Sequence, residues 1–169
     1  MTEAITFEQA IALTQNLLTQ LEQVSETEIQ ATITALMSTE NGARGFFVTY
    51  LTADRPYADQ PSDAVIRALQ TSPAIVSELL VKNLAMSASM AIAHRRTANE
   101  AMAQGSDRVQ RRTTTLIQRV QMPEVTQKAA QLQASAETGV GEYQTFLERW
   151  GYDAEQRQQI AQVMRAICE

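Results

Sequence analysis

The fold of this chain is decided by one long stretch, Ser72 to Val120, which reads SPAIVSELLVKNLAMSASMAIAHRRTANEAMAQGSDRVQRRTTTLIQRV. Pro73 and Pro123 bound the helical pattern, and Gly105 is the one residue between these prolines that strongly disfavours a helix. The first half is apolar and rich in small residues, whereas the second half carries six arginines. We therefore predict that this stretch is the central helical element of an all-α protein, closely packed at one end and cationic at the other.

Whether this element is one helix or two depends on Gly105. A continuous helix from Pro73 to Val120 would be roughly 70 Å long, which is about twice the width of a compact domain of this size. The glycine is a possible carboxy-terminal cap, and the capping-box pattern Asp107-x-x-Gln110 follows it. We predict a break at Gly105 into two antiparallel helices and keep the continuous helix, which would need a partner, as the alternative.

The sequence on both sides of this element also predicts helices joined by short loops. Further helices are expected after Thr6, after Ser25 as far as Asn41-Gly42, over residues 43–52, after Ser62, after Pro123 as far as Thr138, before Gly151 and after Asp153. Gly45 lies inside one of them and costs about 1 kcal/mol relative to alanine unless close packing compensates. No segment alternates with period two, so no strand is expected. The predicted fold is a single-domain bundle of about seven to eight helices over residues 1–169.

The charges are distributed unevenly along the chain. The net charge is −5, but Lys82 to Arg119 holds seven basic and two acidic residues (+5), so the remainder, with seven basic and seventeen acidic residues, sums to −10. An acidic body with a cationic element can bind an anionic partner or a second copy of itself.

Cysteine content and hydropathy indicate the class of protein and its location. The single cysteine, Cys168, excludes an intrachain disulfide and a multi-cysteine metal site. The opening residues MTEAITFEQA lack the basic and apolar regions of a signal peptide. The most apolar window, Ala74 to Ala93, contains Glu78, Lys82 and Asn83, which argues against a membrane span. We expect a soluble, cytoplasmic protein.

Few residues suggest catalytic or metal chemistry. His94 is the single histidine, and Met86, Met90 and His94 are spaced four apart on one helical face. A methionine–histidine pair can ligate haem iron or copper, but a methionine stripe at this spacing is more typical of a core. We therefore predict no metal and no cofactor, and keep a tetrapyrrole or small-molecule pocket near these residues as a third hypothesis.

The remaining candidates for catalysis are acidic. Asp54, Asp59 and Asp63 cluster around the proline-containing loop between Arg55 and Pro61. Three carboxylates in a polar loop are typical of caps and turns rather than of a catalytic pair. With one histidine on a helix, a serine or cysteine nucleophile also lacks a suitable base. We expect no catalytic residue and no enzyme.

The arginines are the predicted binding residues. One helical face is shared by Arg108, Arg111 and Arg112. Two i, i+4 ion pairs are expected, Asp107–Arg111 and Glu100–Arg96. The segment RGFFVTYLTADRPY gathers aromatic and arginine residues, of which Phe46 and Tyr50 are assigned to the core and the others are left open as a binding edge. The predicted partner-binding residues are Arg95, Arg96, Arg108, Arg111, Arg112, Arg119, Arg44, Arg55 and Tyr57.

Twelve arginines against two lysines, with abundant Gln, Ala and Thr, resemble the composition of cyanobacterial proteins. The segments ENGARGFFVTYLTADRP (residues 40–56) and SELLVKNLAMSASMAIAHRR (residues 77–96) resemble an uncharacterised all-helical family of that group. The resemblance covers most of the chain and implies a cytoplasmic bacterial protein, but it transfers no functional residue.

These observations lead to three hypotheses. The first is a non-enzymatic helical protein-interaction, adaptor or assembly protein, expected to form a homodimer, whose arginine face binds an acidic surface on a protein partner or on a second copy. The second is a nucleic-acid-binding regulator that uses the same arginines on phosphates, although a pI of 5.0 opposes it. The third is the tetrapyrrole or small-molecule pocket.

Overall fold

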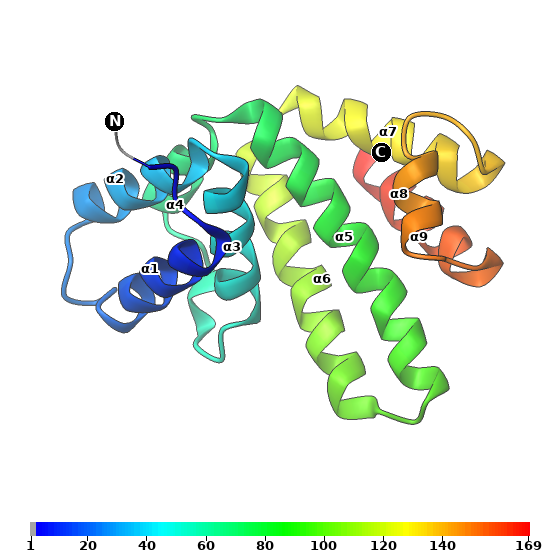
Figure 1. Cartoon of the computed structure of the whole chain (residues 1–169), viewed down its shortest axis with the longest axis horizontal. Coiled ribbons are helices and arrows are strands. Elements are labelled where there is room, and N and C mark those ends of the chain that lie inside the picture. The colour runs from blue at the N-terminus through cyan, green and yellow to red at the C-terminus, as the bar shows by residue number, and fades with distance from the viewer. Residues whose placement is uncertain (1–2) are drawn as a thin grey trace.

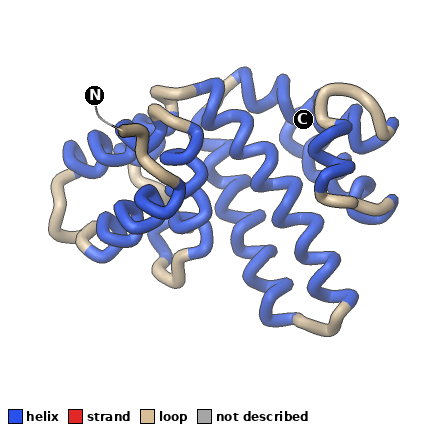
Figure 2. The backbone as a smooth tube through the Cα atoms, in the orientation of Figure 1, coloured by secondary structure: helices blue, strands red, loops and turns tan. Residues whose placement is uncertain are grey.

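The computed structural model describes residues 3–169, and these residues form nine α-helices, one 3₁₀ turn and no strand. The helices are α1 (Phe7–Thr19), α2 (Glu26–Met37), α3 (Glu40–Thr52), α4 (Asp63–Leu69), α5 (Pro73–Arg96), α6 (Glu100–Val120), α7 (Pro123–Thr138), α8 (Gln144–Arg149) and α9 (Ala154–Cys168), with the 3₁₀ turn η1 at Pro56–Ala58. Only short loops connect them (Figure 2). The all-α prediction is confirmed.

Helices α5 and α6 form an antiparallel hairpin at the centre of the molecule (Figure 1). The two-helix prediction is therefore confirmed, but the break lies at Ala98, not at Gly105. Ala98 adopts the left-handed conformation (φ 57°), and the backbone N–H groups of Ala98 and Asn99 donate to the carbonyls of Arg95 and His94. This pair of hydrogen bonds is the Schellman arrangement that ends a helix, here without the usual glycine. The Asn99 side chain then caps α6 by accepting from the Met102 N–H.

Gly105 lies in the second turn of α6 and does not interrupt it. A Cβ at this position would have no neighbour within 4 Å, so the glycine is not there for close packing. Asp107, predicted to begin a helix, lies inside α6 and pairs with Arg95 instead. The prediction was wrong because glycine costs only about 1 kcal/mol inside a helix, and the packing of the other residues of α6 outweighs this cost.

Helices α1 to α4 lie on one side of the hairpin and α7 to α9 on the other (Figure 1). One contiguous apolar core runs through all three parts, and α1 packs on α3 while α5 packs on α6, α7 and α9. At the α1–α3 contact a Cβ on Gly45 would lie 2.4 Å from the Ala10 Cβ. The cost of this glycine in a helix is therefore compensated by close approach of the two backbones.

Local start signals predicted most helix beginnings correctly. The side chains of Thr6, Ser25, Ser62 and Asp153 all accept N-cap hydrogen bonds. The expected helix end at Asn41-Gly42 is wrong, because α2 ends at Met37 and the Thr39 side chain caps α3 by accepting from the Gly42 N–H. Gly42 therefore belongs to the first turn of a helix.

Helix α5 has 24 residues and is, within the part of the chain that the structure describes, the one helix long and apolar enough to cross a membrane. Of its most apolar window, 56% is buried inside the fold. This is the pattern of the core helix of a soluble protein, as the sequence predicted.

Candidate functional site

The arginines of α6 face the chain's own acidic loop. Each of the three aspartates around the α3–α4 connection pairs with one arginine of α6: Asp54 with Arg108 (3.9 Å between Oδ1 and Nη2), Asp59 with Arg112 (2.8 Å between Oδ1 and Nε) and Asp63 with Arg119 (2.9 Å between Oδ1 and Nη2). The acidic loop and the arginine helix, which the sequence analysis treated separately, therefore bind each other.

Arg112 is the most buried of these arginines, with 2% of its side chain exposed. Its guanidinium donates twice to Asp59 and once each to the backbone carbonyls of Leu51, Ala53 and Arg55. All five N–H groups are thus satisfied, which a buried guanidinium requires. The hydrogen bond from Arg112 holds the pKa of the Asp59 carboxyl below its usual value. Arg112 therefore ties α6 to the loop after α3.

Arg95 and Arg96 are also engaged within the chain. Arg95 binds Glu100 and Asp107, and Arg96 binds Asp153 and Glu155 at the start of α9. The expected pairs Asp107–Arg111 and Glu100–Arg96 are therefore wrong, because the turn at Ala98 brings the end of α5 back over the first turns of α6. Arg111 is exposed and makes no ion pair to the described residues.

The aromatic segment, residues 44–57, supplies both core residues and exposed residues. Phe46 and Tyr50 are buried and stack on each other, so their assignment to the core is confirmed. Tyr57 is half-buried; its hydroxyl donates to Glu22 and its carbonyl accepts from the Tyr50 hydroxyl. Arg55 contributes a carbonyl to Arg112 and leaves its side chain exposed. Arg44 lies with its guanidinium carbon 5.0 Å from the centre of the Phe7 ring.

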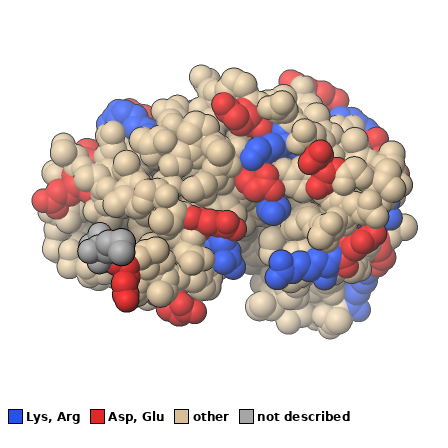
Figure 3. All heavy atoms as spheres, turned by 45° about the horizontal axis from the view of Figure 1, so that its top comes forward, with Lys and Arg blue, Asp and Glu red and all other residues tan. Residues whose placement is uncertain are grey.

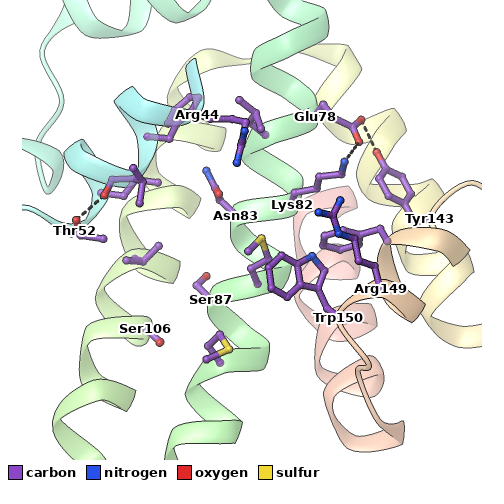
Figure 4. A pocket seen from close by; sticks show the side chains of 18 of the residues that line it. Arg44, Thr52, Glu78, Lys82, Asn83, Ser87, Ser106, Tyr143, Arg149 and Trp150 are labelled. Atoms are coloured by element: carbon purple, nitrogen blue, oxygen red, sulfur yellow. Dashed lines mark hydrogen bonds and ion pairs between the residues drawn. The ribbon is translucent and has the colours of Figure 1, made fainter. Parts of the chain in front are cut away.

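A groove of about 1200 Å³ separates the two sides of the molecule. Side chains of α5 and α6 line its floor, α3 forms one wall, and α7, α8 and the following Trp150 form the other. Figure 4 shows Arg44 reaching in from α3 and Arg149 from α8, with Lys82, Asn83 and Ser87 on α5 between them. Figure 3 shows lysine and arginine side chains beside the hollow in the middle of the molecule.

The groove collects most of the exposed large apolar side chains. Six such residues are exposed in the described part of the chain, and four of them line the groove: Val48 (44%), Met90 (40%), Met102 (53%) and Trp150 (51%). They come from α3, α5, α6 and the end of α8. Exposed apolar side chains that converge on one concave surface are typical of a binding site, whereas single ones are not.

A polar network lies at the α7 end of the groove. The Glu78 carboxylate accepts from the Tyr143 hydroxyl at 2.9 Å and pairs with Lys82 and Lys128, each at 3.2 Å (Figure 4 draws the first two of these). Burial opposes ionisation of Glu78, but hydrogen bonds from Tyr143, Lys128 and Lys82 outweigh it and lower its pKa. Burial, together with the Glu78 hydrogen bond, raises the pKa of Tyr143. Glu78 is therefore held as a carboxylate that anchors both lysines.

The three residues considered for a tetrapyrrole or metal are only partly brought together at this groove. Met86 and Met90 line it, but His94 does not. Among residues 3–169 no group of three or more His, Cys, Asp or Glu side chains is arranged to hold a metal ion. The methionines therefore contribute an apolar, adaptable surface.

Sequence reasoning found Arg44 and Arg108 but missed Arg149, Trp150, Met102 and Lys82 as residues of one surface. Arg149 and Trp150 are neighbours, but Lys82 and Met102 lie on helices far from them in sequence, so no local spacing relates the four. The one available signal was Trp150, the single tryptophan, at the end of a six-residue helix.

The fold and the groove define a class of all-helical protein in which two groups of helices flank a central hairpin and leave a mixed apolar and basic groove. Residues 6–167 match the model of the family described as "Uncharacterised conserved protein UCP020893", and the chain belongs to this family. No curated protein and no solved structure matches the chain.

Proposed function

We propose that this chain is a non-enzymatic helical protein-interaction protein, an adaptor or assembly factor, that holds a partner protein in the groove across α5. One observation carries the proposal: four exposed large apolar side chains from four separate elements converge on one groove of about 1200 Å³. Leaving methionine and tryptophan side chains in water is unfavourable, and burying them against a partner supplies binding free energy.

The arginine face supports this proposal less than the sequence suggested. Five of the six arginines between Arg95 and Arg119 pair with carboxylates of the same chain. These pairs stabilise the hairpin and its contacts with α9 and the α3–α4 loop. They also leave fewer guanidinium groups for the phosphate contacts on which the nucleic-acid alternative depends.

Site-specific photo-crosslinking in the native host tests the docking site. A benzoylphenylalanine at Met90, in the groove, is expected to crosslink to one partner protein. The matched control is the same group at Leu13, which is as exposed (46%) but lies on α1 and does not line the groove. Equal crosslinking at both positions, or none at Met90, would contradict the proposal.

Self-association, a cytoplasmic location and a cyanobacterial source remain predictions from the sequence. Sedimentation equilibrium measures self-association directly. If the chain is a homodimer through the groove, its apparent mass falls to that of a monomer when Trp150 and Met90 are replaced by glutamate.

A further inference from the structure

Resting on the proposed function, we infer the class of the groove's occupant: an amphipathic α-helix of a partner protein whose exposed face is acidic. The groove has an apolar part, formed by Met90, Met102 and Trp150, and a basic part around Arg44 and Arg149. A ligand that satisfies both needs an apolar stripe and negative charges along one element. An amphipathic helix presents both at fixed spacing.

The size of the groove fits a helix. A helix is about 10 Å across and rises about 1.5 Å per residue, so a segment of about ten residues fills about 1200 Å³. The groove has this volume and is open on one side, so a helix could lie in it without threading. Methionine side chains on the floor can adapt to the surface of the inserted helix.

The charge of the groove favours an acidic occupant. Its lining holds five basic residues (Arg44, Lys82, Arg108, Lys128 and Arg149) and three acidic ones (Glu40, Glu78 and Glu142), a net of +2. The chain as a whole has a net charge of −5, so the remaining residues sum to −7. The groove is therefore a positive region on a negative protein, and its field attracts acidic segments.

Arg44 and Arg149 carry most of this attraction. Neither has a carboxylate of the described residues within 4.0 Å, whereas Glu78 already holds Lys82 and Lys128. These two arginines, which make no ion pair to the described residues, lie on opposite walls of the groove (Figure 4). A helix between them could pair with both.

A second copy of this chain fits the groove less well. Outside the groove, the exposed large apolar residues among residues 3–169 are Leu13 on α1 and Val140 in the loop after α7. These two single residues form no apolar stripe that could enter the groove of a neighbour. Two grooves placed face to face would bring their cations together, which opposes association.

Trp150 supplies the readout for a direct test. It is the single tryptophan and half of its side chain is exposed in the groove, so its emission reports on occupancy. The probe is a helical peptide of about 15 residues, with leucines along one face and glutamates elsewhere. Two control peptides carry lysine for every glutamate, or the same composition in an order without an apolar face. We expect the acidic peptide alone to shift Trp150 emission to shorter wavelength and to saturate it.

Charge-reversed variants then identify the arginines responsible. R44E/R149E is expected to bind the acidic peptide at least about tenfold more weakly, and to gain affinity for the lysine peptide. The matched control, R55E/R111E, makes the same change in net charge at two exposed arginines that do not line the groove, and is expected to bind like the unaltered chain. Circular dichroism checks that both variants are folded.

The outcomes separate this inference from the proposed function. Equal binding of the acidic and lysine peptides would overturn the inference that the occupant is acidic. So would equal weakening of binding by R55E/R111E. If no peptide binds while the benzoylphenylalanine at Met90 still captures one partner, the docking function stands and the helical occupant is wrong. A crosslink at Met90 to a second copy, or a small molecule held in native mass spectrometry, also overturns the inference.

Discussion

The Asp59 carboxylate accepts two hydrogen bonds from the Arg112 guanidinium, from Nε at 2.8 Å and from Nη2 at 3.3 Å. The pair joins α6 to the loop after α3 across 53 residues of sequence. Two of the three remaining guanidinium N–H groups bind the Leu51 and Ala53 carbonyls at the end of α3, where a helix leaves carbonyls without partners, and the third binds the Arg55 carbonyl in the loop. The most buried arginine of the predicted binding face is therefore a structural cross-link between two parts of the fold.

Arg112→Ala is expected to destabilise the fold by about 3–5 kcal/mol, since it leaves Asp59 and three backbone carbonyls without their donor. The free energy of unfolding in urea measures this. Arg111→Ala, at the exposed neighbouring arginine, should change stability by no more than about 0.5 kcal/mol. A loss of under about 1 kcal/mol for Arg112→Ala would show that the cross-link is dispensable.

The helix break at Ala98 predicts two stabilising substitutions. Ala98→Gly relieves the left-handed backbone of an alanine and should add about 1 kcal/mol to the free energy of unfolding. Gly105→Ala should add a similar amount, about 1 kcal/mol, because the residue lies within α6 and its new methyl group meets no neighbour. Thermal unfolding of both variants checks this. Destabilisation by Gly105→Ala would indicate that the helix ends at Gly105 after all.

Gly45→Ala makes the same chemical change in another helix and should have the opposite sign. The new methyl group would lie 2.4 Å from the Ala10 Cβ and 2.9 Å from the Phe7 carbonyl oxygen, so α1 must move away from α3. We expect a loss of about 1–3 kcal/mol in urea unfolding. A gain in stability like that expected of Gly105→Ala would mean that α1 does not pack this closely.

Acid is expected to destabilise the protein through its paired carboxyls. The pKa values of Asp59 and Glu78 are lower in the folded chain than their ordinary values, so the unfolded chain binds more protons at acid pH. Their contribution to stability is complete above about pH 4–5 and is lost as the pH falls through the lowered pKa values. Urea unfolding from pH 6 to pH 3 measures the loss, and Glu78→Gln should make it shallower. An unchanged slope in that variant would exclude a role for Glu78.

Local sequence signals predicted the elements of the fold well. Helices begin after Thr6 and Asp153 as expected, each with a capping box, and Pro73 and Pro123 begin helices. These signals act within one helical turn, so they can be read without knowledge of the fold. The errors at Gly42 and Gly105 arose where a glycine fitted both a helix end and a helix interior. In each case a nearby polar cap, Thr39 or Asn99, begins the helix that contains the glycine.

The candidate site could be predicted only in part. The sequence pointed to arginines, and Arg44 and Arg108 do line the groove, but it assigned no binding role to Arg149 or Trp150. The pairing of loop aspartates with α6 could not be foreseen, because partners such as Asp59 and Arg112 are 53 residues apart. The charge composition shows that the chain contains opposite charges, but it does not predict which aspartate pairs with which arginine.

The sequence by itself determined that the chain is helical, where most of its helices begin and that its charges are segregated. The first two depend on interactions between residues three or four apart, which periodicity and caps record directly, and the third is read from the order of the charged residues. Only the tertiary structure decided which arginines are occupied and which are free. Packing α3 and α8 on opposite sides of the hairpin leaves Arg44 and Arg149 beside a groove, while the same packing buries Arg112 against Asp59. The physical reason is that a charge acts on whatever lies within a few ångströms of it in space, and sequence distance does not set that neighbourhood.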